Sequence, residues 1–230
     1  MDNIENVSFT VDAGIINRLG LELVSKSETA LAELIKNSYD ADAKEVNLYF
    51  VNAENVNGTL IIEDDGVGMN REQLLNGFMK LATTDKLHNS ISEIYLRPKA
   101  GKKGIGRFST QRLGTSLEIV TKSFKNDKTI KLTIDWEKYL TDKRIEDVSN
   151  EMTLNYQSRS TGSGTTLTIS GLRDKWSDAD IKRVYRYIAD LIQPNFMEID
   201  ERGNLRQLVE DKRFEVNFFR KNQLWDLFIS

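Results

Sequence analysis

The sequence predicts a two-layer α/β (α+β) sandwich, in which helices cover one face of a mixed, mainly antiparallel sheet. Two observations favour this fold. Short segments alternate apolar and polar residues and are joined by turns, as in 46–51 and 59–62 around Asn57-Gly58. Other segments repeat apolar residues at helical spacing, as in 26–41 and 177–192. A doubly wound parallel sheet fits less well, because the hairpins lack crossover helices.

The composition narrows the class of protein. The chain has 230 residues, 29% charged and 39% hydrophobic, which suits a folded globular chain rather than a disordered one. A net charge of −3 gives no bulk support for nucleic-acid binding, although it does not exclude a local basic patch. The sequence has no cysteine, no signal-peptide pattern in residues 1–10 and no apolar run of the ~18 residues that span a membrane. We therefore expect a cytoplasmic protein with no membrane partner.

The first half of the chain contains two predicted helices around a hairpin. The apolar face of the helix at 26–41 consists of Ala30, Leu31, Leu34 and Ile35. Ser25 and Glu28 have the spacing of a capping box at its start. A second helix is predicted to begin at Asn70, with Gln73 three residues later as its capping partner.

The second half begins with a long polar segment. Residues 80–104 are rich in glycine and polar groups, which is typical of a lid or binding loop. Strands are predicted at 117–121, 129–134 and 165–170, followed by the amphipathic helix at 177–192. We expect one domain over residues 1–195. Residues 196–230, which mix charges with Phe and Trp, are expected to begin a following region that is cut off.

The first polar cluster lies on the helix at 26–41. Glu33, Asn37 and Asp40 are spaced at i, i+4 and i+7, so they share one helical face opposite the apolar residues. A carboxylate such as Glu33 can polarise a water that attacks a phosphate. The amide oxygen of Asn37 suits Mg²⁺, which prefers hard oxygen ligands. Taken alone, such a face is more often only solvated.

The second cluster, Asp65-Gly66-Val67-Gly68-Met69, follows a predicted strand. An acid between a strand and a flexible turn can accept a hydrogen bond from an exocyclic amine such as that of adenine. Glycines there let a base or ribose approach the backbone closely. An ordinary turn is the alternative. A calcium loop does not fit, because the acids are adjacent rather than alternating.

The third cluster runs from Gly101 to Ser109 and combines glycines with basic residues. Its three glycines allow consecutive backbone amides to cradle a phosphate, and a helix that starts near Arg107 would add its N-terminal field. The cluster is not a P-loop, because Arg107-Phe108 follows Gly106 in place of Lys-Ser/Thr. In isolation, a flexible surface loop explains it as well.

Together and in this order, the clusters resemble the motifs of the GHKL superfamily, the ATP-binding domains of gyrase, heat-shock chaperones, MutL and histidine kinases. Residues 33–41 resemble its N box, 65–69 its first glycine box and 101–109 its second. Gly164-Thr165-Thr166-Leu167 resembles the strand that closes the adenine pocket. The resemblance covers about residues 15–195 and is nearest to bacterial MutL-, microrchidia- and chaperone-like domains. It implies the Bergerat fold.

The resemblance also implies roles for residues of this chain. Glu33 would be the general base, and Asn37 would hold the Mg²⁺ that bridges the phosphates of ATP. Asp65 would bind the adenine amine, and residues 80–110 would form an ATP lid. The nucleotide-contacting set implied by the motifs is Asn37, Asp40, Ala41, Asp65, Gly68, Met69, Thr84, Lys86, Gly101, Lys103, Gly104, Ile105, Gly106, Arg107, Phe108 and Thr165.

The expected function is Mg²⁺-dependent ATP binding and hydrolysis in the N-terminal part of a larger switch protein. Lid closure and homodimerisation through residues 1–23 are expected to accompany ATP binding, and an effector domain is expected beyond Ser230. A histidine-kinase-like phosphotransferase is one alternative. Glu33 argues against it, because those kinases usually have Asn at that position. A nucleotide sensor that does not hydrolyse and a nucleotide-independent interaction module are the others.

Overall fold

The structure of this chain, a computed structural model, describes residues 8–80, 90–101, 106–126, 128–157, 162–192, 197–199, 205–207, 214–220 and 223–224. Its helices and strands are, in chain order, α1 (Ile15–Leu23), α2 (Ser27–Asp40), β1 (Glu45–Val51), β2 (Thr59–Asp64), α3 (Arg71–Gln73), η1 (Leu74–Met79), α5 (Gly106–Leu113), β3 (Ser116–Lys122), β4 (Thr129–Asp135), η2 (Trp136–Tyr139), η3 (Ile145–Asp147), β5 (Glu151–Leu154), β6 (Gly164–Ser170), α6 (Asp178–Ile192), β7 (Met197–Ile199), β8 (Leu205–Gln207), β9 (Glu215–Arg220) and β10 (Gln223–Leu224). None of the described helices is long and apolar enough to cross a membrane.

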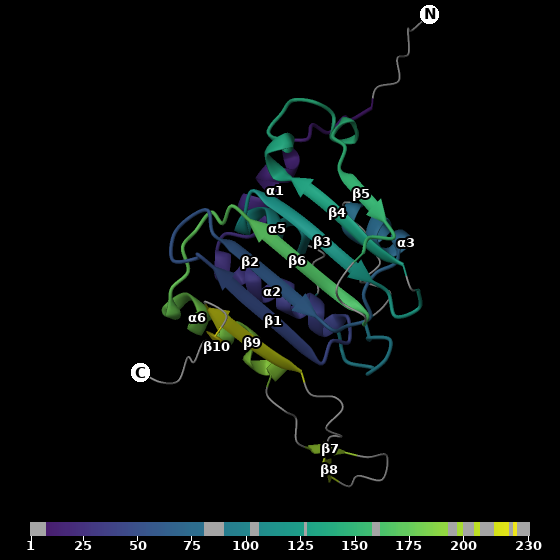
Figure 1. Cartoon of the computed structure of the whole chain (residues 1–230), viewed down its shortest axis with the longest axis vertical. Coiled ribbons are helices and arrows are strands. Elements are labelled where there is room, and N and C mark those ends of the chain that lie inside the picture. The colour runs from purple at the N-terminus through teal and green to yellow at the C-terminus, as the bar shows by residue number, and fades with distance from the viewer. Residues whose placement is uncertain are drawn as a thin grey trace, which may run out of the picture.

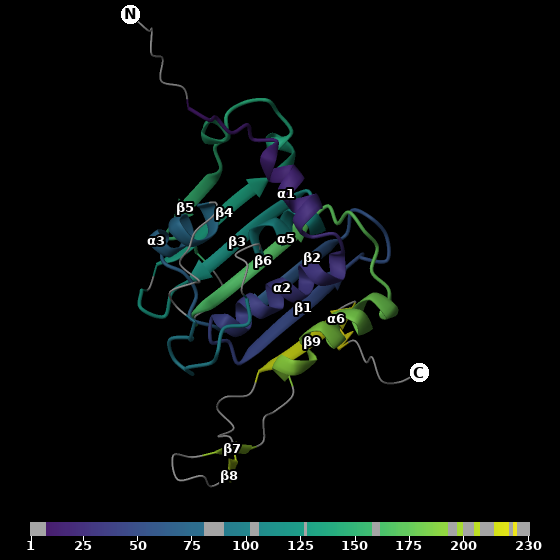
Figure 2. The same cartoon turned by 180° about the vertical axis from the view of Figure 1, so that it is seen from behind.

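The main sheet has eight strands in the order β10-β9-β1-β2-β6-β3-β4-β5. All neighbouring strands in it are antiparallel except β1 and β9, which run parallel. The sheet faces the viewer in Figure 1, and the view from behind in Figure 2 shows α1, α2 and α6 lying across its other face. The predicted two-layer fold with a mixed, mainly antiparallel sheet is therefore confirmed.

Helix α2 forms because its apolar side chains recur at helical spacing and all reach the core. Ala30, Leu31, Leu34 and Ile35 are at most 3% exposed, as their pattern predicted. The capping box predicted at the start of this helix does not form. The N-cap residue is Lys26 rather than Ser25, and its side chain makes no capping hydrogen bond. Glu28 pairs instead with a cation on another helix.

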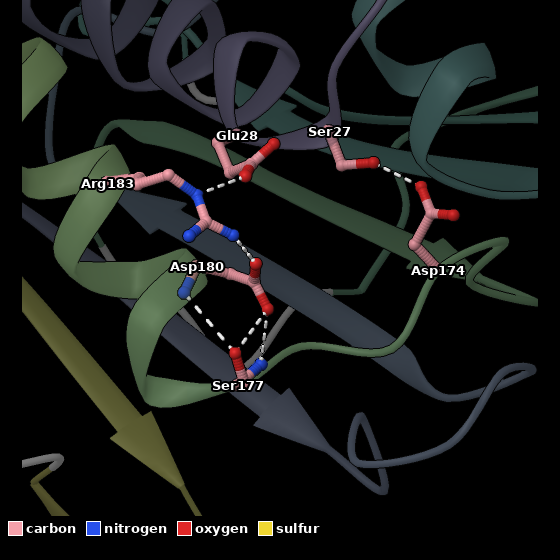
Figure 3. Close-up of polar contacts among 6 residues, drawn as sticks. All are labelled: Ser27, Glu28, Asp174, Ser177, Asp180 and Arg183. Carbon is pink, nitrogen blue, oxygen red and sulfur yellow. Dashed lines mark hydrogen bonds and ion pairs between the residues drawn. The ribbon is translucent and has the colours of Figure 1, made fainter.

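That cation is Arg183 of α6, and Figure 3 shows how it joins the two helices. Arg183 Nε donates to Glu28 Oε1 at 2.6 Å, and its guanidinium also pairs with Asp180 one turn earlier. At the start of α6, Ser177 Oγ donates to Asp180 Oδ2 at 2.6 Å. Beside this network, Ser27 Oγ donates to Asp174 in the loop before α6. These contacts fix the N-terminal end of α2 to the β6–α6 connection.

The helix predicted from Asn70 begins as expected. Asn70 Oδ1 accepts from Gln73 N and Gln73 Oε1 accepts from Asn70 N, both at 2.9 Å, which completes the capping box. After α3, however, the chain continues as the π-helix η1. Such wide turns are rare and are often found near functional sites.

The domain boundary predicted at residue 195 does not coincide with the end of the sheet. Strand β9 lies beyond it and pairs with β1 from Glu45–Glu215 to Phe50–Arg220. Tyr49 and Phe219 stack across this pair with ring centroids 4.7 Å apart. Residues 214–220 are therefore part of the same sheet. The sequence pattern also predicts neither α1 nor β5.

Candidate functional site

Three strands and the end of α2 meet at one end of the sheet. Asp64, the last residue of β2, pairs in register with Thr165 of β6. Thr165 pairs in turn with Thr121 of β3 on its other side. The chain leaves β2 through the glycine turn at 66–68, which lies against the last turn of α2 because Val67 N donates to Ala41 O at 2.8 Å. The predicted second cluster and Thr165 are thus brought together.

Asp64 is the partly buried carboxylate at the centre of this arrangement. Its Oδ1 accepts from the backbone N–H of Gly66 at 3.1 Å and of Thr165 at 3.2 Å. Its Oδ2 accepts from Ser38 Oγ of α2 at 3.0 Å. Burial raises the pKa of this carboxyl to about 6, against the effect of these hydrogen bonds, which lower it. A carboxylate held in this way can accept one further hydrogen bond from a ligand.

Asp65, for which the resemblance to the GHKL motifs implies adenine binding, makes different contacts. Its Oδ1 accepts from the backbone N–H of Lys44 at 2.8 Å and of Glu45 at 2.9 Å, and the side chain is exposed. These bonds tie the turn to the start of β1. The structure therefore gives Asp65 a role in fixing the backbone, and Asp64 the position next to Thr165.

Two glycines allow the backbones to approach closely here. Gly68 has φ +60°, and a Cβ added to it would lie 2.0 Å from the carbonyl oxygen of Lys122. Gly164 has φ +139°, and its Cβ would lie 2.1 Å from the carbonyl oxygen of Asp64. Any larger residue at either position would separate the glycine turn from β3 or β6.

Thr121 links the turn to both strands and was not among the predicted site residues. It is 1% exposed, and its Oγ1 accepts from Met69 N at 2.9 Å. The same oxygen lies 3.0 Å from Thr165 Oγ1 and 3.2 Å from the carbonyl oxygen of Gly164. A hydroxyl that both donates and accepts can join these three groups at once. It fixes Met69 and Thr165 relative to each other.

The predicted polar face of α2 is present. Glu33 and Asn37 are partly buried on the side of the helix opposite its apolar face. Glu33 Oε1 pairs with Lys36 Nζ at 3.0 Å, and the side chain of Glu33 is 20% exposed. Glu33 therefore remains accessible to solvent while Lys36 restrains it. Ser38 on the same helix is not among the predicted site residues, and it points to Asp64 instead.

Asp40 and Asp42, at the end of α2, hold residues 90–101 in place. Asp40 accepts from the backbone N–H of Ala100 at 2.7 Å and of Gly101 at 3.1 Å. The amides that Asp42 holds are those of Ile94 and Tyr95, at 2.6 and 3.2 Å. The second part of the predicted lid segment is thereby fastened to the helix that carries Glu33 and Asn37.

Arg97 adds a buried cation to this attachment. It is 4% exposed, and its Nη1 donates to the carbonyl oxygen of Ala43 at 2.6 Å. Its guanidinium lies 4.8 Å from the ring centroids of both Tyr39 and Tyr95, and 5.9 Å from that of Phe214. Such cation–π contacts compensate part of the cost of removing the charge from water. Phe214 precedes β9, so this contact also connects the segment to the far strand.

The third cluster is described only in part. Gly101 lies at the end of the fastened segment, and Gly106 and Arg107 begin α5. Phe108 is 7% exposed and packs into the core. The remaining predicted residues, Thr84, Lys86, Lys103, Gly104 and Ile105, lie outside the described residues.

The donor set at this site suits Mg²⁺ only in combination with a ligand. Among the described residues, no three His, Asp or Glu side chains gather into a metal site. Mg²⁺ commonly takes one or two protein oxygens and completes its shell with phosphates and waters. The amide of Asn37, on the same helical face as Glu33, fits that pattern.

Comparison with known proteins agrees with this geometry. Residues 24–165 match the family described as histidine kinase-, DNA gyrase B-, and HSP90-like ATPase. The chain belongs to this family. The match runs from the start of α2 to Thr165, so it includes all the strand ends that form the site. The resemblance to the GHKL superfamily is thereby confirmed, and membership in this ATPase family implies ATP binding.

Individual relatives are distant and much longer. The chain is 32% identical over 88 residues to the DNA mismatch repair protein MutL of Carboxydothermus hydrogenoformans, covering 38% of this chain and 14% of that protein. It is 26% identical over 227 residues to the chaperone protein HtpG of Campylobacter jejuni, covering 88% of this chain and 35% of that protein. The HtpG of Campylobacter jejuni subsp. doylei gives the same identity and coverage. The chain thus spans about a third or less of these relatives.

Proposed function

We propose that this chain binds ATP with Mg²⁺ and hydrolyses it to ADP and phosphate, as the ATPase part of a larger switch protein. The observation that carries the proposal is the Asp64 carboxylate. It is held by Ser38 and Thr165 at the end of the sheet, beside a glycine turn in the left-handed conformation. Family membership supports the general activity, and the geometry supports the assignment of roles.

Asp64 takes the adenine-binding role in this proposal, in place of Asp65. Its carboxylate would accept a hydrogen bond from the exocyclic amine of adenine. Thr165 and Thr121 would complete the polar floor of the pocket with their hydroxyls, which are 3.0 Å apart. Gly68 and Met69 would border the base, because the glycine turn lies directly against these strands.

The phosphates would lie along the polar face of α2. Asn37 would give its amide oxygen to Mg²⁺, which supplies charge neutralisation on the phosphates when bound. Glu33 would orient the attacking water and accept its proton as the general base. Its ion pair with Lys36 holds the carboxylate in place without burying it. The N-terminal end of α5, which begins at Gly106, would offer backbone amides to the phosphates.

Turnover tests the catalytic assignment. We expect Glu33→Gln to lower the rate of phosphate release about 100-fold or more while leaving nucleotide binding intact. Glu72→Gln on the exposed side of α3 is the matched control and should turn over like the parent. Equal turnover in Glu33→Gln and the parent would mean that Glu33 is not the base. Phosphate that appears on a protein partner instead of in solution would favour a phosphotransferase.

Nucleotide-dependent dimerisation is the second part of the proposal. Phe9 is fully exposed and Val11 is 46% exposed, in the segment before α1. Exposed apolar side chains of this kind are available for a contact with a second copy. Light scattering should give twice the monomer mass when a non-hydrolysable ATP analogue is added. The variant Phe9→Ser should weaken that response, and an unchanged mass in the parent would count against the dimer.

A further inference from the structure

A polar recess lies at the N-terminal end of α2, away from the proposed nucleotide site. Its walls come from the start of α2, the last turn of α5, the β6–α6 connection and the first two turns of α6. It has a volume of about 530 Å³ and is open to solvent. Ten residues of α2 separate Ser27, which lines the recess, from Asn37, so the two sites lie about 15 Å apart along this helix.

Charged side chains dominate the lining of this recess. The four cations among the described lining residues are Lys26, Arg112, Lys175 and Arg183. The three carboxylates are Glu28, Asp174 and Asp180. Four positive and three negative charges leave a net charge of +1, so the recess as a whole favours an anion.

Each of the three carboxylates is already paired with an arginine. Figure 3 shows Arg183 between Glu28 and Asp180, with which it forms ion pairs. In the β6–α6 connection, Asp174 Oδ2 accepts from Arg112 Nη1 at 2.7 Å. The carboxylates of the recess therefore neutralise its arginines and leave the lysines unpaired.

Lys26 and Lys175 are the two cations of the recess without a carboxylate partner. Both residues are exposed, and neither side chain forms an ion pair or a hydrogen bond within the described part of the chain. They start close together, because Ser27 Oγ donates to Asp174. Lys26 precedes that serine and Lys175 follows that aspartate, so each lysine is one residue, about 3.8 Å, from the bonded pair. The flexible four-carbon stem of lysine lets both ammonium groups reach a ligand between them.

Arg112 brings further donors to the same place. Its Nη1 is used by Asp174, whereas its Nε and Nη2 have no hydrogen-bond partner among the described residues. Neither of these two nitrogens is fully buried, and the side chain is 17% exposed. Adjacent N–H groups of a guanidinium can donate in parallel to two oxygens of one phosphate group.

We propose that this recess binds the dianionic phosphate group of a small phosphate monoester. The two lysines and Arg112 are three cations beside the single carboxylate of Asp174, which leaves a local charge of +2. A phosphate monoester carries about −1.5 to −2 charges at pH 7 and has three terminal oxygens, so it can accept from all three cations. A monocarboxylate carries less charge and has one oxygen fewer. The volume of the recess leaves room for the organic part of the ligand.

Glycerol 2-phosphate is a probe with this chemistry, and glycerol and acetate are its controls. In a ¹H–¹⁵N spectrum, we expect glycerol 2-phosphate at millimolar concentration to shift the backbone amide signals of residues 26–28 and 174–176. Glycerol should not shift them, and acetate should bind about fivefold more weakly or worse. Binding should be tighter at pH 7.5 than at pH 5.5, because the second proton of a phosphate monoester dissociates near pH 6.

Variants test the two lysines directly. Lys26→Gln combined with Lys175→Gln removes both charges at exposed positions and should weaken binding about tenfold or more, because hydrogen bonds from charged donors are lost. Lys138→Gln on η2 is the matched control. Lys138 is also exposed and makes no ion pair within the described residues, so this variant should bind like the parent.

Unmoved signals at residues 26–28 and 174–176 in the parent would overturn the proposal. Acetate that binds as tightly as glycerol 2-phosphate would also overturn it, because the recess would then attract anions in general. Equal affinity in the double variant and the parent would show that the lysines do not hold the ligand. These titrations need no nucleotide, so their outcome is independent of the proposed ATPase activity.

Discussion

Replacing Asp64 with Asn should stabilise the fold at neutral pH while removing the group proposed to recognise adenine. Burial raises the pKa of Asp64 from 3.8 to about 6 in the folded chain. Each unit of pKa shift corresponds to about 1.4 kcal/mol, so the ionised carboxylate costs the fold about 3 kcal/mol at pH 7. Partial exposure to solvent makes this an upper bound. The neutral amide of Asn avoids the cost.

The sign of the pH dependence follows from the raised pKa. Because the folded state binds the proton more tightly than the unfolded state, the parent is stabilised as the pH falls through 6 towards 3.8. The advantage of Asp64→Asn should therefore be largest at pH 7 and fall to about half by pH 5. Asn keeps an oxygen for the amides of Gly66 and Thr165, and Ser38 can rotate to accept from its new N–H₂ group.

Urea denaturation at several pH values between 5 and 7.5 measures this difference without nucleotide. Asp65→Asn is the matched control, because Asp65 is exposed and an amide oxygen can still accept from Lys44 and Glu45. We expect that control to show no such pH-dependent gain. An Asp64→Asn variant that is less stable than the parent at pH 7, or a difference that does not change with pH, would refute the reasoning.

Three further predictions concern the supports of the site. Gly68→Ala should lower the free energy of unfolding by about 2 kcal/mol or more, because its φ of +60° and the nearby Lys122 carbonyl oppose a side chain; denaturant titration measures this. Arg97→Met should speed hydrogen exchange at the amides of residues 94–101, because the guanidinium fastens this segment to α2. Asp174→Asn should destabilise the fold at pH 7 and less so in acid. Burial opposes ionisation of Asp174, but hydrogen bonds from Ser27 and Arg112 outweigh this effect and lower the pKa of the carboxyl. Thermal unfolding of Asp174→Asn and the parent at several pH values measures the difference in stability.

Each of these has a control or a result that contradicts it. Gly77→Ala in η1 is the control for Gly68, because a Cβ there meets nothing within 4 Å. Unchanged exchange at residues 94–101 in Arg97→Met would show that Asp40 and Asp42 hold the segment without the arginine. A loss of stability in Asp174→Asn that grows as the pH falls would contradict the depressed pKa of Asp174.

Periodicity predicted the elements whose partners are close in sequence. The β1–β2 hairpin has its own turn, with Asn57 at φ +66°, and the buried face of α2 follows from spacing alone. The pairing of β9 with β1 could not be predicted in this way. It joins residues about 170 positions apart, and no local pattern encodes such a contact. The same limit applies to α1, whose place is set by packing on α5.

The choice between Asp64 and Asp65 depends on which of them lies on the same face of the sheet as the buried residues of β2. Leu60 and Ile62 are at most 1% exposed, and Asp64 follows them at the same period of two. This alternation predicts that the side chain of Asp64 lies on the face of the sheet that the helices cover. The contacts with Ser38 and Thr165 depend on pairing between distant segments, so sequence alone could not reveal them.

The most direct test of the central claim is calorimetric titration with a non-hydrolysable ATP analogue, with and without Mg²⁺. The parent and Asp65→Asn should both bind in a magnesium-dependent manner, whereas Asp64→Asn should stay folded and lose binding. Binding that is retained in Asp64→Asn but lost in Asp65→Asn would contradict our assignment of the adenine pocket. Absence of binding in the parent would contradict the proposed ATPase function of this chain.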